Sequence, residues 1–233
     1  MWQTADLRCL VAAAFPSAFL FPRSVAVSRS VCPRCARPRP LCLCPLIPSL
    51  SSRTRVLVLQ HPFESRHALN TARLAVLGLE RARLLVGAQF GPQAWEAPGL
   101  RSVLLFPGES SQPLAAASGD GPLQLIVLDG TWKQARKMLR DNPELAALPR
   151  AHPPMEPAGA ASRYRVRHAD LPGALSSIEA IVRALNVLEA PAAYDALLRP
   201  FEALVDAQIR AMGQDTYERH HLRRSPGRKG RQA

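Results

Sequence analysis

Apolar residues along this chain gather in short continuous runs that alternate with segments of helical periodicity. The runs predict buried strands, because strands that are covered on both faces of a parallel sheet carry no polar side. We predict such strands at residues 55–60, 83–86, 103–106, 123–129 and 164–167. Apolar positions three and four residues apart predict helices at residues 65–79, 131–140, 176–188 and 192–212. The alternation predicts an α/β fold with a mainly parallel sheet flanked by helices.

This α/β region covers residues 51–217, and three further segments surround it. Residues 1–30 show no informative pattern and stay unassigned. Residues 31–50 are dense in cysteine and proline, which predicts a small module built from loops. Residues 218–233 predict a disordered basic tail.

The sequence predicts no membrane partner, because no apolar run reaches the roughly 18–20 residues that cross a bilayer. The most apolar stretch near the start, residues 10–21, is interrupted by Pro16. It also lacks a clear cleavage site, which disfavours a secretory signal, while an organelle-targeting extension stays open. We interpret the protein as cytoplasmic.

The charge of the chain points to a polyanionic partner. Its formal net charge is +12 and its pI is about 10.7, a balance that favours nucleic acid. The predicted tail holds six basic residues against Glu218, and removing its +5 from +12 leaves +7. The body of the protein is therefore basic without its tail.

Four cysteines predict a metal site. Cys32 and Cys35 form a CxxC pair, and Cys42 and Cys44 form a CxC pair shortly after it. This spacing suits tetrahedral zinc, and four thiolate ligands leave no open position, so the metal would be structural. The alternatives are two disulfides or redox-active thiols. A reducing compartment disfavours disulfides, and Pro33 disfavours the helix that a redox CxxC normally opens.

Polar residues cluster where the predicted strands end. Residues 61–67, 105–109 and 129–132 follow three of these strands, and residues 162–167 and 175–179 add further polar groups. Each has an ordinary explanation, such as a helix cap at Thr131 or a solvated face at Arg163 and Arg165. Their common place at the carboxyl edge of one sheet favours a binding site. The sequence contains no P-loop, GxGxxG, HExxH or GxSxG motif, so those enzyme classes have no support.

Several rare motifs occur in a fixed order: CxxC and CxC, then HPFESRHALNT, LFPGE, LDGTWKQARKML, SRYRVR and LSSIEA. In this order they resemble the DTW-domain proteins, the tRNA-uridine aminocarboxypropyltransferases, over about residues 32–212. The Asp-x-Thr-Trp signature is intact at residues 129–132, with Gly130 at the variable position. Ser177 stands where members often carry threonine, and it keeps the hydroxyl. The first 30 residues and the tail lie outside the resemblance.

The resemblance implies a sheet related to that of the SPOUT methyltransferases, with a C-terminal cofactor site, and leaves open whether the backbone is knotted. It implies S-adenosylmethionine as co-substrate and tRNA as partner. The 3-amino-3-carboxypropyl group would pass to N3 of a uridine in tRNA, with release of 5′-methylthioadenosine. The oligomeric state is not implied.

The resemblance and the chemistry together give a set of expected site residues. Uridine N3 carries a weakly acidic proton, so a carboxylate is needed to accept it: Asp129 first, then Glu179 or Glu64. The expected cofactor-binding residues are Leu105, Phe106, Pro107, Gly108, Glu109, Asp129, Gly130, Thr131, Trp132, Ser176, Ser177 and Ile178. The expected RNA-binding residues are Arg66, Lys133, Arg136, Lys137, Arg163 and Arg165. The expected zinc ligands are Cys32, Cys35, Cys42 and Cys44.

Two other functions stay open at this point. One is a SPOUT-like RNA methyltransferase, which would release S-adenosylhomocysteine in place of methylthioadenosine. The other is a zinc-containing RNA-binding protein without catalysis, which would not bind S-adenosylmethionine.

Overall fold

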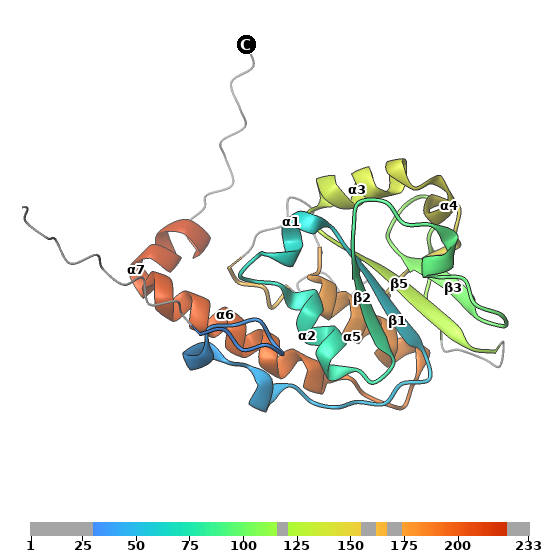
Figure 1. Cartoon of the computed structure of the whole chain (residues 1–233). Helices are drawn as coiled ribbons and strands as arrows, with labels where there is room; N and C mark the ends of the chain where they lie inside the picture. The colour runs from blue at the N-terminus through green and yellow to red at the C-terminus, as the bar shows by residue number, and fades with distance from the viewer. Residues whose placement is uncertain (1–29, 116–120, 155–161, 167–173, 223–233) are drawn as a thin grey trace, which may run out of the picture.

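The computed structural model of the chain describes residues 30–115, 121–154, 162–166 and 174–222 (Figure 1). Six strands form one sheet in the order β2-β1-β5-β3-β6-β4, and every pair of neighbours is parallel. The strands are β1 Arg55–Gln60, β2 Ala82–Val86, β3 Arg101–Leu105, β4 Gln112–Pro113, β5 Leu123–Asp129 and β6 Arg150–His152. The predicted α/β fold with a mainly parallel sheet is therefore confirmed.

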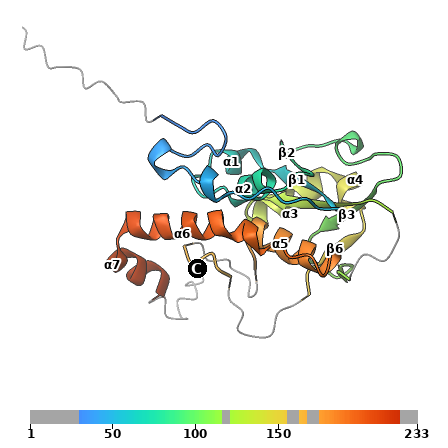
Figure 2. The ribbon, with the colours of Figure 1, turned by 90° about the horizontal axis from the view of Figure 1, so that it is seen from below.

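Helices cover both faces of the sheet. The α-helices are α1 Pro62–Ser65, α2 Thr71–Gly78, α3 Trp132–Asp141, α4 Pro143–Ala146, α5 Ser177–Leu188, α6 Leu198–Met212 and α7 Gln214–Tyr217. Figure 1 shows α3 and α4 above the sheet, with α2, α5 and α6 on the other side. Figure 2 shows α6 extending past the sheet, with α7 turning at its far end. Within the described residues, no helix is both long enough and apolar enough to cross a membrane.

The alternation of side chains along the central strands gives each helix layer its own core. Val56 and Val58 of β1 pack with α2, α5 and α6, whereas Leu57 and Leu59 pack with α3 and α4. All seven residues of β5 are buried, because this strand is covered on both faces. This double cover is the reason that β1 and β5 read as continuous apolar runs in the sequence.

The chain changes direction between the two central strands. From β1 it passes through α1 and α2 to β2, whereas from β5 it passes through α3 and α4 across β3 to β6. Because β1 and β5 are neighbours in register, with Gln60 opposite Asp129, the two connections diverge at their carboxyl ends. Such a divergence opens a crevice, which is where ligands bind in parallel α/β sheets.

Several predictions of local structure were wrong. The helix predicted at 65–79 starts only at Thr71, because Asn70 accepts a hydrogen bond from the Arg73 amide and caps α2 there, while Ser65 ends the separate short helix α1. The described part of the strand predicted at 164–167 is a turn. The tail predicted from residue 218 begins with a π-helical segment, Glu218–Leu222, and its remainder lies outside the described residues, as do residues 1–29. The short strands β4 and β6 were missed.

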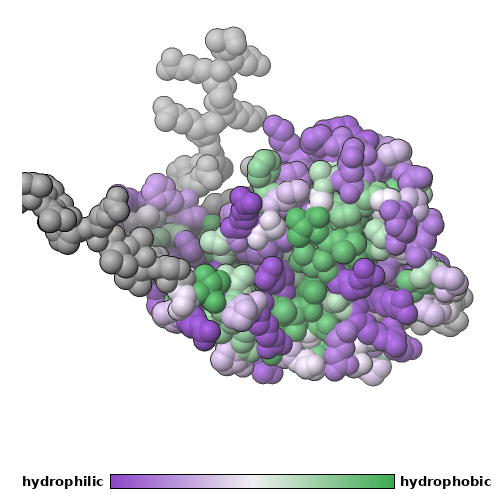
Figure 3. Space-filling view, in the orientation of Figure 1, coloured by the Kyte–Doolittle hydropathy of each residue, from purple (hydrophilic) through white to green (hydrophobic). Residues whose placement is uncertain are grey.

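The cysteine-rich segment belongs to the main core and is not an independent body. Cys35, Leu43 and Ile47 are buried in the same cluster as α2, α5 and α6. Two 3-10 turns, Arg39–Leu41 and Cys44–Leu46, shape the segment, and Figure 1 shows it beside α6. The edge strand β2, which pairs with β1, carries the exposed side chain of Val86, and Figure 3 shows hydrophobic residues gathered over this strand.

A buried carboxylate fastens the start of β1 to the end of α5. Glu189 is only 6% exposed and accepts hydrogen bonds from the amides of Arg53 and Thr54 at 3.0 and 2.7 Å. It also accepts one from the Tyr194 hydroxyl at 2.6 Å. Burial opposes ionisation, but the hydrogen bonds outweigh it and lower the pKa of Glu189 below its ordinary value.

Replacing Glu189 with Gln should lower the free energy of unfolding by about 1–3 kcal/mol at pH 7, because amide hydrogens would face the donors that the carboxylate now satisfies. The folded-state pKa lies below the unfolded one, so this stabilisation is present above the unfolded pKa and is lost as the pH falls through the folded one. Urea unfolding across that range measures it, with the exposed Glu96→Gln as control. A constant difference down to the lowest pH would contradict the assignment.

Candidate active site and metal centre

A cavity of about 230 Å³ lies where β1 and β5 diverge, beside the first turn of α5. Its wall comes from four parts of the chain that are far apart in sequence. The described residues that line it are Glu64, Leu69, Asn70, Thr71, Asp129, Gly130, Thr131, Trp132, Lys133, Ser162, Tyr164, Ala174, Leu175, Ser176 and Ser177. The sheet edge that was predicted to hold the site therefore does hold a cavity.

Asp129 is one of the two carboxylates among the described residues that line this cavity. It ends β5, is 7% exposed, and is held from two sides. Its Oδ2 accepts a hydrogen bond from Gln60 Nε2 at 2.7 Å, and its Oδ1 accepts one from the Ser177 hydroxyl at 2.5 Å. The two bonds fix the plane of the carboxylate between β1 and α5.

Gln60 extends this network to a second strand end. The residue is 1% exposed, and its amide nitrogen also donates to Asn70 Oδ1 at 3.1 Å. Asn70 in turn caps α2 and donates to the Glu64 carbonyl at 3.3 Å. One buried side-chain amide thus joins Asp129 to the segment between α1 and α2.

The turn after Asp129 is shaped by a capping box. The Thr131 hydroxyl accepts from the Gln134 amide, and the Gln134 side chain accepts from the Thr131 amide, so α3 starts at Trp132. A Cβ at Gly130 would lie 3.1 Å from the Gln134 side chain, so glycine gives this box its space. Trp132 is half-buried, lines the cavity and packs on Phe106 with ring centroids 5.6 Å apart.

The other two candidate carboxylates have different surroundings. Glu64 is buried on α1 and lines the cavity with Asp129. Glu179 is also buried, but its oxygens accept from the Ser162 hydroxyl, the Arg163 amide and both the amide and hydroxyl of Ser176. Glu179 is outside the described cavity wall and ties the 162–163 segment to the start of α5.

Some predicted cofactor-binding residues lie away from the wall. Leu105 is buried at the end of β3, and Ile178 is fully buried in the core. Pro107, Gly108 and Glu109 are exposed. None of these is among the described residues that line the cavity, and the LFPGE segment reaches it only through the contact of Phe106 with Trp132.

The six basic residues predicted to bind RNA fall into two groups. Lys133 lines the cavity, and Arg66 and Arg136 are exposed. The remaining three form ion pairs on the surface, Lys137 with Asp141, Arg163 with Glu202 and Arg165 with Asp206. Exposed pairs of this kind contribute at most about 1 kcal/mol each, so a phosphate can displace the carboxylate at little cost.

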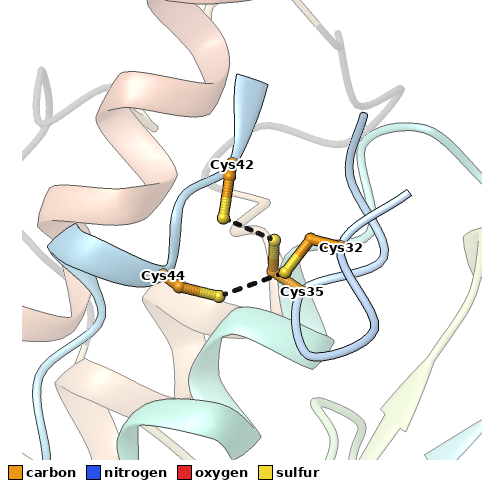
Figure 4. Close-up of side chains that lie close together, drawn as sticks. All are labelled: Cys32, Cys35, Cys42 and Cys44. Carbon is orange, nitrogen blue, oxygen red and sulfur yellow. Dashed lines mark hydrogen bonds between the residues drawn. The ribbon is translucent and has the colours of Figure 1, made fainter. Parts of the chain in front are cut away.

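The four cysteines form one compact cluster (Figure 4). Their sulfur atoms all lie within 4.8 Å of one another, with Cys32 to Cys44 at 3.6 Å and Cys35 to Cys42 at 3.7 Å. Four sulfurs around one zinc at about 2.3 Å would be about 3.8 Å apart, whereas a disulfide needs about 2.05 Å. Hydrogen bonds from the backbone amides of Cys35 and Arg34 lower the pKa of the Cys32 thiol to about 6, whereas burial and the neighbouring thiols raise the pKa of Cys44, so the sulfur spacing and not the titration of these thiols is what suits a metal.

The cysteine segment also contacts the loop that leads to the cavity. The Arg37 guanidinium donates to the Ala68 carbonyl, and the Tyr164 hydroxyl donates to the Leu69 carbonyl at 3.0 Å. Leu69 and Tyr164 both line the cavity. The loop between α1 and α2 is therefore held from one side by the cysteine segment and from the other by residue 164.

The comparison with known families agrees with this arrangement. A sequence model of the DTW domain matches residues 29–209, which include the cysteine cluster and the whole cavity wall. The chain belongs to the DTW domain family. The predicted resemblance is thereby confirmed.

Curated relatives of this DTW protein carry one activity in their names. The chain is 33% identical over 195 residues to tRNA-uridine aminocarboxypropyltransferase 2 of Drosophila melanogaster, and the match covers 78% of this chain and 76% of the relative. It is 31% identical over 218 residues to the protein of the same name in Macaca fascicularis, covering 86% and 71%. Over 134 residues it is 34% identical to tRNA-uridine aminocarboxypropyltransferase A of Arabidopsis thaliana, covering 48% and 51%. The search of solved structures found no match.

The set of site residues predicted for this DTW protein missed part of the wall and its support. Leu69, Asn70 and Tyr164 line the cavity, and Gln60 positions Asp129 from behind. The sequence did contain a signal for Gln60. This amide ends the apolar strand RVLVLQ, and a buried polar side chain needs a hydrogen-bond partner nearby.

Two buried glutamines at opposite ends of the sheet allow a matched test of the network. Gln60 binds Asp129, whereas Gln124, near the amino end of β5, donates to the Trp95 carbonyl and the Ser102 hydroxyl. Replacing either with Leu should lower the free energy of unfolding by about 1–3 kcal/mol, because buried acceptors lose their donor. Chemical denaturation measures both variants. Wild-type stability for Gln60→Leu would contradict the network.

Proposed function

We propose that this protein transfers the 3-amino-3-carboxypropyl group of S-adenosylmethionine to N3 of a uridine in tRNA. The observation that carries the proposal is the oriented carboxylate of Asp129, held by Gln60 and Ser177 in a cavity at the divergence of two strands. Family membership and the names of the relatives support the reaction class. We also propose that the sheet is related to that of the SPOUT methyltransferases.

The reaction needs a base and an aligned co-substrate. The sulfonium of S-adenosylmethionine supplies the leaving group: the bond from N3 to the methionyl γ-carbon forms, the bond from that carbon to sulfur breaks, and methylthioadenosine leaves as a neutral thioether. The N3 proton must pass to an acceptor. Selection of the γ-carbon over the methyl group is a matter of alignment, which a preformed wall provides.

Asp129 is the proposed acceptor of the N3 proton. Both of its oxygens are oriented by donors from β1 and α5, and the residue lines the cavity where the uridine would bind. Glu64 shares the cavity and is the second candidate. Glu179 is the weakest of the three predicted bases, since the hydrogen bonds of its carboxylate serve the start of α5.

The remaining wall would hold the two substrates. Trp132, Leu69 and Leu175 offer apolar surface to the adenosine part, and the Ser176 and Thr71 positions offer hydroxyl groups. Lys133 at the cavity, together with exposed Arg66 and Arg136, would contact the tRNA backbone. Lys137, Arg163 and Arg165 would join this set of tRNA contacts if phosphates displaced the surface carboxylates with which these three residues pair.

The cysteine cluster would hold a structural zinc ion. Its sulfur spacing suits tetrahedral coordination, and four ligands leave no position for a substrate. The ion would neutralise the thiolates and fix the segment that contacts the α1–α2 loop. Catalysis would remain with the cavity residues.

The transfer reaction can be tested directly with purified protein, S-adenosylmethionine and tRNA from a strain that lacks the gene. We expect methylthioadenosine as the nucleoside product and a uridine heavier by one aminocarboxypropyl group in digested tRNA. S-adenosylhomocysteine with a methylated nucleoside would establish the methyltransferase alternative instead. Binding of tRNA without either product, and no calorimetric signal for S-adenosylmethionine, would leave only RNA binding.

Replacing Asp129 with Asn should lower the single-turnover rate of transfer by about 10²- to 10⁴-fold, because the amide cannot accept the proton as a carboxylate does. Asp215→Asn, an exposed change on α7 with the same loss of charge, is the control and should transfer at the wild-type rate. A fast Asp129→Asn variant combined with an inactive Glu64→Gln variant would move the role to Glu64. Gln60→Leu should slow transfer and Gln124→Leu should not.

Purified protein should contain about one zinc ion per chain by elemental analysis, because the four cysteines offer one tetrahedral site. Cys35→Ser or Cys42→Ser should remove most of it and lower the melting temperature, since Cys35 is part of the main core. Cys9→Ser, which changes the one cysteine of the sequence that is not predicted as a ligand, is the control. A metal-free protein with its thiols oxidised in pairs would contradict the zinc assignment.

A further inference from the structure

Phe63 is exposed to an unusual degree for an aromatic residue. At 79% exposed it exceeds every other large hydrophobic side chain in the described part of the chain, the next being Val31 at 52%. A phenylalanine in water gains nothing for the fold, because its burial would contribute about 1.5–3 kcal/mol. Neither the catalytic proposal nor the predicted site residues give this ring a role.

Phe63 lies on α1, directly after the end of β1 at which the cavity is found. His61 follows β1, donates its amide to the Asp129 carbonyl at 2.9 Å, and lies against Gly130. Its side chain caps α1 by accepting from the Phe63 amide, and its ring lies 5.3 Å from the Phe63 ring. Figure 1 shows α1 beside the start of α3. Phe63 is therefore the direct neighbour of Glu64 in the cavity wall, and its ring packs on His61, which contacts Gly130 of the same wall.

Neighbouring positions on α1 divide between the cavity and the solvent. Glu64 is buried in the cavity wall, while Phe63 before it is exposed. Consecutive helical residues diverge by about 100°, so one turn serves two surroundings. Beyond Gly130, Trp132 lines the cavity and packs on Phe106. The cavity wall thus includes the ring of Trp132, and an exposed ring, Phe63, comes next to its residue Glu64 in sequence.

The charges around the ring select the kind of partner. Exposed Arg66 and His67 follow Phe63 within one turn, and Lys133 lies at the cavity. An exposed aromatic ring near the cationic side chains of Arg66 and Lys133 suits single-stranded RNA, because phosphates can meet these cations while a base stacks on the ring. A second protein would need a stable interface of roughly 1,200 Å² or more, and the largest group of hydrophobic residues on the face in Figure 3 lies over β2.

We propose that Phe63 is an outer stacking site for a nucleobase that flanks the target uridine of the tRNA. This step rests on the proposed function, because it takes tRNA as the substrate. The target base would enter the cavity while its neighbour remains outside and stacks on Phe63. Such a site holds the unpaired strand open next to the reacting base, whatever the identity of the neighbour, because every base has a π-face.

The test compares variants that keep or lose a planar ring. Phe63→Ala and Phe63→Leu should weaken binding of unmodified total tRNA by about 5- to 150-fold, while Phe63→Tyr and Phe63→Trp should stay near wild type. Affinity for S-adenosylmethionine and the melting temperature should not change, since the ring is exposed. The dependence of the dissociation constant on salt should keep its slope in Phe63→Ala, whereas Lys133→Ala should lower that slope by about one.

The outcomes separate this inference from the function on which it rests. If wild-type protein binds tRNA but transfers nothing, the proposed function fails, while the binding series still tests Phe63. Wild-type tRNA affinity in Phe63→Ala overturns the stacking site. Equal retention by Leu and Trp also overturns it, because any apolar group would then suffice. A change in oligomeric state in Phe63→Ala would overturn it as well and identify the ring as a contact between two copies of the chain.

Discussion

The carboxylate of Asp129 is the group on which the rest of the site depends. It sits at the end of the most deeply buried strand, and a charge there is tolerable only with donors on both sides. Gln60 from β1 and Ser177 from α5 supply them. The two partners lie 69 and 48 residues away in sequence, so the network forms only when the whole sheet and α5 have assembled. Site formation and folding are thereby linked.

The cysteine segment takes part in the same arrangement from outside the sheet. Its buried residues belong to the core that α2, α5 and α6 share, and Arg37 reaches the loop before α2. That loop carries Asn70, which meets Gln60 behind Asp129. The segment that was predicted as a separate module therefore packs in the main core and contacts the loop that leads to the cavity wall. A structural metal at this place would have a direct mechanical connection to the cavity.

The sequence predicted the fold where burial is complete and failed where it is partial. β1 and β5 are covered on both faces, and α3 and α5 begin with capping boxes, so their patterns are unambiguous. β4 and β6 are two and three residues long and partly exposed, so they are too short for the alternation of hydrophobic and polar residues to be recognised. The alternation of Arg163 and Arg165 suggested a strand, but it arises from ion pairs with Glu202 and Asp206 on α6. Glu179 was predicted as a candidate base, and the structure shows that its side chain also forms the capping box at the start of α5.

The start of α5 gives adjacent serines different tasks. The Ser176 hydroxyl caps the helix with Glu179, and the Ser177 hydroxyl holds Asp129. A helix turns by about 100° per residue, so the angular phase of its first turn decides which hydroxyl faces the sheet. Deletion of one residue at position 174 or 175 would, with the helix start held in place, put Ser177 at the cap and Ile178 opposite Asp129, which would then lose its hydroxyl partner. The register in which the chain enters α5 is thus a constraint on the site in addition to the identity of its side chains.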